Sequence, residues 1–283
     1  MFYCPTPALQ DNVIWILGAG EKPRAGDPAP ERATPVLVVD PGEADALHQS
    51  LLDQHLALHA IVVTHHHGDH VGGIARLLAL WPQALLVDAQ PQHSRLGDDL
   101  ALLSGRIVTP QPGQTLVLPG LDGLRIDVLA VPGHTLDHLA YVVTGPGCDD
   151  APLLLCGDTL FSAGCGRMFE GTPAQFADSL ARLAALPDDT RVLCAHEYTL
   201  SNLRFAQAVE PGNAEIAAHT AWAQQQRAQG LYTLATELRQ EKRINPFLRL
   251  GEAAVIAAAR REGARGSDPV SVFAALREWK NRF

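Results

Sequence analysis

The stretch Thr64-His65-His66-His67-Gly68-Asp69-His70-Val71-Gly72-Gly73 decides the fold class of this 283-residue chain. It follows an apolar run, Ala60–Val63, that predicts a buried strand, and it precedes a helical pattern that begins near Gly72. A turn from strand to helix directs closely spaced side chains into one crevice at the carboxyl end of the strand. Imidazole nitrogens and a carboxylate are the ligands that Zn²⁺ and similar divalent ions prefer. The stretch therefore predicts a metal site.

The spacing of these ligands favours two ions over one. His65, His67, Asp69 and His70 come from so short a loop that a single ion cannot readily accept all four, whereas two ions with two ligands each relieve the strain. A run of histidines resembles an affinity tag, but such tags lie at chain ends and this run follows a buried-looking strand.

Three more ligand-type residues follow predicted strands. His134 comes after Val131-Pro132-Gly133, Asp158 follows Cys156-Gly157, and His196 follows Leu193-Cys194-Ala195. Residues at the carboxyl ends of neighbouring strands converge on the same edge, so these side chains are candidate ligands as well. Taken alone, Asp158 is also compatible with a turn cap, and the nearby His138 is expected to be structural.

The rest of the chain predicts a layered α/β domain followed by helices. Apolar, β-branched runs indicate strands at Val13–Leu17, Val36–Val39, Ile61–Val63, Leu85–Val87, Leu116–Leu118, Ile126–Val131, Leu139–Val143, Leu153–Cys156 and Val192–Cys194. Helical patterns occupy Ala44–Leu58, Gly73–Trp81 and a segment opened by Thr172-Pro173. From about Tyr198 onward we expect no strands, only helices at Asn213–Gln229, Leu231–Lys242, Glu252–Glu262 and from Asp268-Pro269 towards Lys280. Gly18–Pro35 and Gly145–Pro152 are expected to be surface loops.

Composition and charge narrow the class of protein. The chain is 47% hydrophobic and 19% charged, which is enough for a packed core, and its net charge of −9 disfavours nucleic-acid binding. Residues 239–283 are different, with ten Lys/Arg against five Asp/Glu, which suits either a small anionic ligand or ordinary solvated helix faces. The five scattered cysteines predict reduced thiols. With no signal-like N-terminus and no apolar stretch long enough to span a bilayer, we expect a cytoplasmic protein without membrane contact.

The metal-ligand pattern resembles the metallo-β-lactamase superfamily, with T-H-x-H-x-D-H, G-H-T, G-D and a late histidine. The resemblance implies an α/β fold, an αββα sandwich with a binuclear site at one edge. It further implies that His65, His67 and His134 bind one ion, that Asp69, His70 and His196 bind the other, and that Asp158 bridges both.

Further motifs resemble the glyoxalase II, or hydroxyacylglutathione hydrolase, family. They are Gly157–Arg167 with Phe169-Glu170-Gly171-Thr172, Cys194–Thr199 with Asn202–Ala206, Glu241–Phe247 and Phe273–Lys280. The resemblance runs from about Asn12 to the end, and implies a catalytic domain at residues 1–197 with a small all-helical glutathione-binding domain at 198–283. Gly18–Pro35 resembles an insertion relative to the family, and the loop near Gly147 is a second candidate.

The resemblance also implies which residues contact glutathione. These are Arg167, Phe169, Tyr198, Arg277 and Lys280, of which Arg277 and Lys280 face the same way on a predicted helix. Many family members carry tyrosine at the position of Phe169, so a hydroxyl contact to the glutathione backbone is absent here. Phe169 still offers a ring for packing.

The implied activity is hydrolysis of the thioester of S-(2-hydroxyacyl)glutathione, such as S-D-lactoylglutathione, to glutathione and D-lactate, the second step of methylglyoxal degradation. A hydroxide bridging two divalent ions, with Zn²⁺ expected and Fe or Mn as alternatives, is the expected nucleophile, and Asp69 and Asp158 are assigned as catalytic through the ions they hold. The leading alternative is a glutathione persulfide dioxygenase on the same scaffold with a single iron. A lactonase, a β-lactamase and a non-catalytic metal-binding protein are weaker alternatives, and a monomer is expected.

Overall fold

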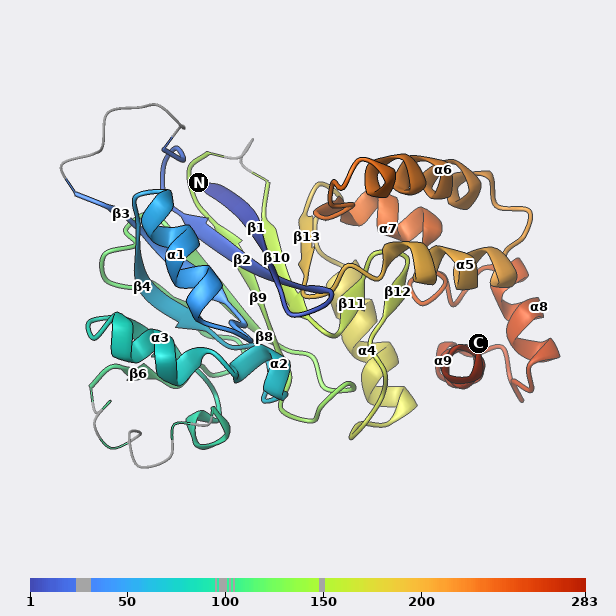
Figure 1. Cartoon of the computed structure of the whole chain (residues 1–283). Helices are drawn as coiled ribbons and strands as arrows, with labels where there is room; N and C mark the ends of the chain where they lie inside the picture. The colour runs from blue at the N-terminus through green and yellow to red at the C-terminus, as the bar shows by residue number, and fades with distance from the viewer. Residues whose placement is uncertain (24–31, 95, 97–100, 102, 104, 148–150) are drawn as a thin grey trace. The chain divides into compact units, whose positions relative to one another are not determined.

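A computed structural model of the chain describes residues 1–23, 32–94, 96, 101, 103, 105–147 and 151–283 (Figure 1). These residues form two compact units. The first unit comprises Met1–Leu129 and Leu139–Gly157, and the second comprises Ala130–His138 and Asp158–Phe283. The central parts of the predicted insertions, residues 24–31 and 148–150, lie outside the described residues.

The first unit contains a six-stranded sheet in the order β1-β2-β3-β4-β5-β6. The strands β1 and β2, and β2 and β3, pair antiparallel, whereas β3 to β6 are parallel. The carboxyl ends of β3, β4 and β5 therefore meet at one edge of the sheet, where loops can present ligands. Their bounds are β1 Phe2–Ala8, β2 Asn12–Gly18, β3 Thr34–Val39, β4 Leu56–Val62, β5 Leu85–Val87 and β6 Ile107–Val108.

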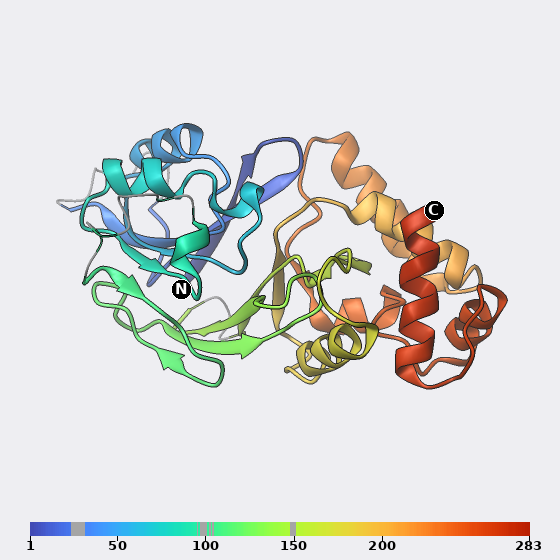
Figure 2. The same cartoon turned by 90° about the horizontal axis from the view of Figure 1, so that it is seen from below.

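Two helices cover one face of this sheet. In α1 (Asp45–Asp53) and α3 (Ile74–Leu80), the apolar side chains Leu47, Leu51, Ile74 and Leu77 are fully buried in a core shared with the strands. This burial follows from the helical spacing of the leucines, which places them on one face. Figure 2 shows both helices on one side of the sheet and the green strands of a second sheet on the other.

The second sheet of the first unit runs in the order β10-β9-β8-β7. These strands are β7 (Thr115–Leu116), β8 (Arg125–Ala130, which ends at the unit boundary), β9 (Leu139–Thr144) and β10 (Leu153–Gly157). The two sheets of this unit are joined near the end of β4. Leu139 donates its N–H to the carbonyl oxygen of Thr64 at 2.9 Å, and the Tyr141 hydroxyl donates to that of Val63 at 2.8 Å.

The second unit is largely helical. Its short strands are β11 (Leu160–Phe161) and β12 (Gly164–Cys165), which form a hairpin, and β13 (Arg191–Cys194) and β14 (Thr236–Glu237), which pair antiparallel. Its helices are α4 Pro173–Ala184, α5 Thr199–Val209, α6 Ala214–Ala228, α7 Leu238–Ile244, α8 Ala253–Arg261 and α9 Pro269–Arg282.

Aromatic rings fill the interior between these helices. Phe273 of α9 packs against Phe176 of α4 and against Phe247, with ring centroids 5.3 and 5.8 Å apart. Phe205 of α5 contacts Phe247 and Trp279. All these rings except Trp279 are fully buried, so the C-terminal helices share one apolar core.

Every strand predicted from the sequence overlaps an observed strand, and most predicted helices are confirmed. The prediction for Ala44–Leu58 is wrong at its end, because α1 stops at Asp53. His55 then adopts a left-handed conformation with φ of 55°, which breaks the helix and lets Leu56–Val62 join the sheet.

The expectation that no strand follows Tyr198 is also wrong. Within the predicted helix Leu231–Lys242, only Leu238 onward is helical, and Thr236–Glu237 pairs with Arg191–Val192. Upstream, the Thr233 N–H and hydroxyl donate to the carboxylate of Glu197, so this backbone is bonded away from any helix. The β-branched threonines favour the extended conformation.

We expect the cap of α4 to contribute measurably to stability. The Thr172 hydroxyl accepts from the Gln175 N–H at 3.3 Å, and the Gln175 side chain accepts from the Thr172 N–H at 3.0 Å. Replacing Thr172 by Ala removes one half of this capping box and should lower the free energy of unfolding by about 1 kcal/mol. Urea unfolding measures the loss, and Thr172→Ser, which keeps the hydroxyl, should stay within about 0.5 kcal/mol of the wild type. Equal losses in both variants would contradict the assignment.

Candidate metal and substrate site

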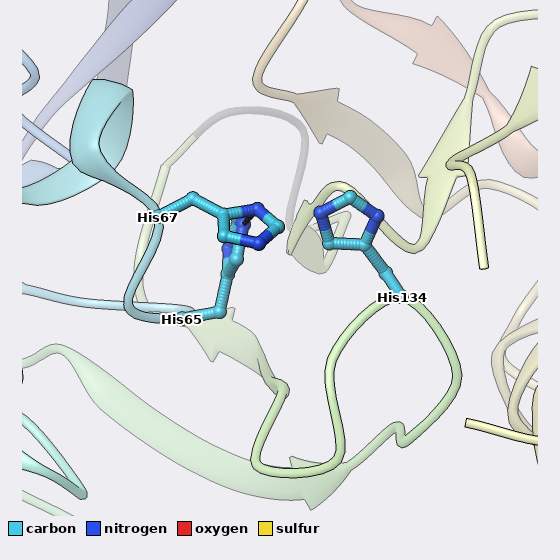
Figure 3. A group of neighbouring side chains, drawn as sticks. All are labelled: His65, His67 and His134. Carbon is cyan, nitrogen blue, oxygen red and sulfur yellow. Dashed lines mark hydrogen bonds between the residues drawn. The ribbon is translucent and has the colours of Figure 1, made fainter. Parts of the chain in front are cut away.

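The predicted metal-binding loop follows β4 in the first unit. His67 is the N-cap of a short helix, α2 (Gly68–Val71), which begins before the predicted start near Gly72. Asp69 and His70 therefore lie on a helical turn, whereas His65 and His67 precede it. His65 and His70 are buried, and Figure 3 shows His65 and His67 projecting from the loop side by side.

These four residues form two close pairs of ligand-type atoms. His65 Nε2 lies 3.0 Å from His67 Nδ1, and His70 Nε2 lies 3.6 Å from Asp69 Oδ2. The loop thus brings its four ligand-type side chains together as two close pairs.

Asp40, at the end of β3, orients both buried histidines of the loop. Its carboxylate accepts from the Thr64 N–H at 2.8 Å, the Thr64 hydroxyl at 2.6 Å and His70 Nδ1 at 3.0 Å. The Thr64 hydroxyl donates its only proton to Asp40. The hydroxyl oxygen of Thr64 therefore accepts a hydrogen bond from His65 Nδ1, 3.1 Å away. Both rings therefore carry their proton on Nδ1 and present the lone pair of Nε2 to a metal.

Asp69 is held from the N-terminal hairpin. The side-chain amide of Asn12 donates to Asp69 Oδ2 at 3.2 Å and to the Asp69 carbonyl at 3.3 Å. Gly42 packs so closely that a Cβ there would lie 2.0 Å from the Asp69 carbonyl oxygen. A side chain at position 42 would therefore displace the helical turn that carries Asp69.

The remaining three predicted ligands belong to the second unit, where they form two more pairs. Asp158 directs one oxygen to each histidine: Oδ2 lies 3.4 Å from His134 Nε2, and Oδ1 lies 3.3 Å from His196 Nε2. All three side chains are buried. His134, which Figure 3 also draws, donates from Nδ1 to the carbonyl oxygen of Arg167 at 2.7 Å, so its Nε2 again offers a lone pair.

The spacing within these pairs fits shared coordination of a divalent ion. A tetrahedral ion with ligands at about 2.0–2.1 Å separates neighbouring donor atoms by about 3.3–3.4 Å. The four pairs span 3.0 to 3.6 Å, and all their donor atoms are imidazole nitrogens or carboxylate oxygens. Asp40, His65 and His70 also lie within metal-binding reach, but Asp40 already accepts three hydrogen bonds. The described histidine and aspartate groups are suited to binding metal ions.

Of the predicted basic pair on α9, Arg277 is buried and Lys280 is half-buried. Arg277 Nη1 donates to the carbonyl oxygens of Cys165 and Gly166 at 3.0 and 3.1 Å. Lys280 Nζ donates to Asn202 Oδ1 at 2.6 Å and lies 5.0 Å from the centre of the Phe205 ring. Burial, aided by the charges of Arg277 and Arg204, lowers the pKa of Lys280 to about 8.

The other predicted glutathione contacts are more open. Phe169 is 58% exposed, its ring lies 5.3 Å from that of His134, and the Arg167 guanidinium lies 5.9 Å above it. Tyr198 stacks on His196, with ring centroids 4.8 Å apart and the planes 2° from parallel. Every predicted substrate contact thus belongs to the unit that carries His134, Asp158 and His196.

Two cysteines near the site are poor nucleophiles. Burial raises the pKa of Cys194 to about 12 and also raises that of Cys165. A thiol needs to ionise near neutral pH to attack a thioester, so neither side chain supports a covalent mechanism. The four described cysteines are all thiols, which agrees with the prediction from their spacing.

Two residues that contact the candidate ligands, Asp40 and Asn12, were not predicted from the sequence. Asp40 follows a predicted strand in Val38-Val39-Asp40-Pro41, which was the available signal, but its histidine partner lies 30 residues away. His138 was expected to be structural, and its Nε2 accepts the Asp158 N–H at 3.1 Å.

The helices of the described residues were also compared with the length and apolar character that a membrane span requires, and none of them meets both.

Comparison with known proteins places both parts of the chain. Residues 31–196 match the family model of the metallo-β-lactamase superfamily, and residues 197–283 match that of the hydroxyacylglutathione hydrolase C-terminus. Among solved structures, the chain is similar to ETHE1 from Myxococcus xanthus, with a TM-score of 0.58 and 22% sequence identity. The match covers 99% of this chain and 98% of that protein, and it shows a similarity of fold.

Curated relatives match over nearly the whole length. The hydroxyacylglutathione hydrolase of Cupriavidus taiwanensis is 47% identical over 279 residues, which covers 99% of this chain and 98% of that protein. The hydroxyacylglutathione hydrolase of Vibrio parahaemolyticus is 41% identical, covering 98% and 97%. The predicted α/β metallo-β-lactamase fold with a C-terminal helical domain is confirmed. The chain belongs to the hydroxyacylglutathione hydrolase family, a group of hydrolases within the metallo-β-lactamase superfamily.

Proposed function

We propose that this enzyme hydrolyses the thioester of S-(2-hydroxyacyl)glutathione, with S-D-lactoylglutathione as the expected substrate. The products are glutathione and a 2-hydroxy acid, here D-lactate, in the second step of methylglyoxal detoxification. The observation that carries the proposal is that one unit contains both the basic residues Arg277 and Lys280 of α9 and the paired candidate ligands His134, Asp158 and His196. The names of the curated relatives supply the substrate class.

The proposed metal centre would hold two divalent ions. His65 and His67 would share the first ion with His134, and Asp69 and His70 would share the second with His196. Asp158 would bridge, since its two oxygens address different histidines. When bound, such ions lower the pKa of water towards 7 and polarise a carbonyl. The nitrogen and oxygen donors suit Zn²⁺, with Fe or Mn as alternatives.

The protein's own residues keep the site ready for this chemistry. Asp40, Thr64 and the Arg167 carbonyl accept hydrogen bonds from Nδ1 of three histidines. The proton of each ring is therefore held on Nδ1, and Nε2 remains the basic nitrogen. Asp69 and Asp158 are the only anionic members of the predicted ligand set and offset cationic charge. A thiol leaving group with an unperturbed pKa of about 8.5 departs without a dedicated acid.

Glutathione is an anionic tripeptide and suits the basic C-terminal segment. Lys280 offers a cation beside the rings of the second unit, while Phe169 and Tyr198 offer surfaces for packing. The Arg277 side chain donates to the backbone carbonyl oxygens of Cys165 and Gly166, and so holds the segment that leads to Arg167. Phe169 lacks the hydroxyl that many relatives carry, which we expect to weaken binding modestly.

The persulfide dioxygenase alternative is disfavoured by residues 197–283, which match the hydrolase C-terminal family model. We propose a catalytic domain at residues 1–197 and a glutathione-binding domain at 198–283. A monomer in the cytoplasm is the simplest state for such an enzyme, and the thiol state of the described cysteines is compatible with a reducing compartment.

Removal of a ligand should abolish thioester hydrolysis. His65→Ala deletes one member of the His65/His67 pair and should lower kcat/KM for S-D-lactoylglutathione by more than about 100-fold, since even outer partners of ligands are worth about 10–100-fold. His66→Ala is the matched control because His66 is a neighbour outside the predicted ligand set, and it should stay within about threefold. Absence of hydrolysis by a metal-loaded wild type would sink the substrate assignment, and oxygen uptake with glutathione persulfide would then be measured.

Asp40 should matter through the histidines it orients. Asp40→Asn replaces one of the two accepting oxygens by an NH2 group, which cannot accept a hydrogen bond from Thr64 or His70, so metal affinity should fall about 10–100-fold. Competition with a chelator measures the affinity. Asp88→Asn is the matched control, since Asp88 is a buried carboxylate after the adjacent strand β5 that accepts from Gln90 N–H and the Ser94 hydroxyl. An equal loss in both variants would show that the effect is not specific to Asp40.

Lys280 should give substrate capture a pH dependence. Because its pKa is lowered to about 8, Lys280 is cationic below that pH and neutral above it, whereas the substrate carboxylates stay anionic. We expect kcat/KM to fall as pH rises through about 8, because this ratio reports the free enzyme. The Lys280→Met variant should have a low kcat/KM at all pH values, and its kcat/KM should not fall as the pH rises through about 8. A fall near pH 8 that persists in Lys280→Met would assign the step to another group.

A further inference from the structure

Side chains of the C-terminal helices hold the backbone of residues 161–166, which is the turn between β11 and β12 together with β12 and Gly166 and is called the turn below. Asn202 of α5, Glu241 of α7, Asn245 just after α7, and Arg277 of α9 all bond to its backbone. The contacts are Asn202 Nδ2 to Ser162 O at 2.9 Å, Ala163 N to Glu241 Oε2 at 2.8 Å, Asn245 Nδ2 to Phe161 O and Gly164 O at 3.1 and 2.9 Å, and Arg277 Nη1 to Cys165 O and Gly166 O at 3.0 and 3.1 Å.

Glu241 is central to this arrangement. Its side chain is completely buried, and its Oε2 accepts from both the Ala163 N–H and Asn245 Nδ2, the latter at 3.4 Å. Ala163 has a φ of 55°, in the left-handed region that non-glycine residues rarely adopt. A buried acceptor for its N–H therefore selects this conformation of the turn. Burial raises the pKa of Glu241, and the Ala163 hydrogen bond opposes that rise.

The far end of the same turn lies against two predicted ligands. Gly166 packs on Asp158 so tightly that a Cβ there would lie 1.9 Å from the Asp158 carbonyl oxygen and 3.1 Å from His134 Nδ1. The next carbonyl, that of Arg167, accepts from His134 Nδ1 at 2.7 Å. The path of the turn thus determines where this acceptor lies and how the His134 ring is aimed.

We propose that Glu241 is a positioning residue for the metal centre, which acts by holding the turn at residues 161–166 so that the Arg167 carbonyl orients His134. Asn245 acts with it on the same turn. The inference rests on the proposed role of His134 as a ligand. It assigns to the C-terminal helices a second role besides the proposed substrate binding, which is to keep His134 Nε2 oriented towards the metal.

The test compares Zn²⁺ affinity, measured by competition with a chelator, in Glu241→Ala and Glu241→Gln. Glu241→Ala frees the turn and should weaken Zn²⁺ binding by about 10–100-fold, the range for partners that orient ligands. Glu241→Gln keeps an accepting oxygen for Ala163 and should restore affinity to within about threefold of the wild type. Asn245→Ala, which releases the turn from the other side, has the same expectation as Glu241→Ala and decides the matter if that variant does not fold.

The control is Glu210→Ala in the same unit. Glu210 is also buried, and it accepts two hydrogen bonds from Arg249, at 2.7 and 3.0 Å, away from the turn. This variant should lose thermal stability but keep Zn²⁺ affinity. Wild-type affinity in Glu241→Ala, or an equal loss of affinity in Glu210→Ala, would overturn the proposal.

Activity separates this inference from the proposed function. In Glu241→Ala saturated with Zn²⁺, kcat for the thioester should fall more than KM rises, because a misaimed ligand affects the reaction more than substrate capture. A wild type that binds Zn²⁺ without cleaving any glutathione thioester would refute the substrate assignment alone, since the chelator measurement still reads the role of Glu241. A wild type that binds no divalent ion would overturn both.

Discussion

A histidine that binds metal must offer a lone pair, and the other ring nitrogen must therefore give its proton to a fixed acceptor. The site depends on this constraint. Asp40 serves His70 directly and His65 through the Thr64 hydroxyl, and the Arg167 carbonyl serves His134. Asp40 lies 24 residues from Thr64 and 30 from His70, and Arg167 lies 33 residues from His134, so these orienting contacts depend on the tertiary structure.

The two units meet this requirement by different means. In the first, parallel strands end at one sheet edge, and the carboxylate after β3 reaches the loop after β4. In the second, a tight turn carries the acceptor, and side chains from the C-terminal helices hold that turn. The helical segment therefore supports the backbone next to one candidate ligand, in addition to the substrate-binding role that we propose for it.

Local patterns predicted much of the fold, and the failures have physical causes. The buried strands around Val36–Val39 and Leu153–Cys156 and the capped helix at Thr172 were evident because propensity and burial agree there. The strand Phe2–Ala8 was missed because Pro5 and Pro7 disfavour a strand; as an edge strand of its sheet it tolerates them. The helix ending at Asp53 was overextended because the left-handed residue, His55, has no sequence signal as strong as glycine.

The candidate site shows the same division. The predicted ligands follow the ends of strands, and four of them have the spacing H-x-H-x-D-H. In the structure they lie in close pairs within each unit. Asp40, Glu241 and Asn245 could not be inferred, because their partners lie 24 to 84 residues away and depend on tertiary packing. Local sequence thus predicts the candidate metal ligands, while the residues that hydrogen-bond to them become evident only from the three-dimensional fold.

We propose that the four pairs of candidate ligands would hold two ions, with Asp158 as a ligand to both. The most direct measurement is the number of divalent ions per chain, by elemental analysis of protein dialysed against trace metal, for the wild type and Asp158→Ala. We expect two ions per wild-type chain and fewer than two in Asp158→Ala, because each oxygen of Asp158 lies beside a different histidine. A single ion per wild-type chain, or two ions retained without Asp158, would contradict it.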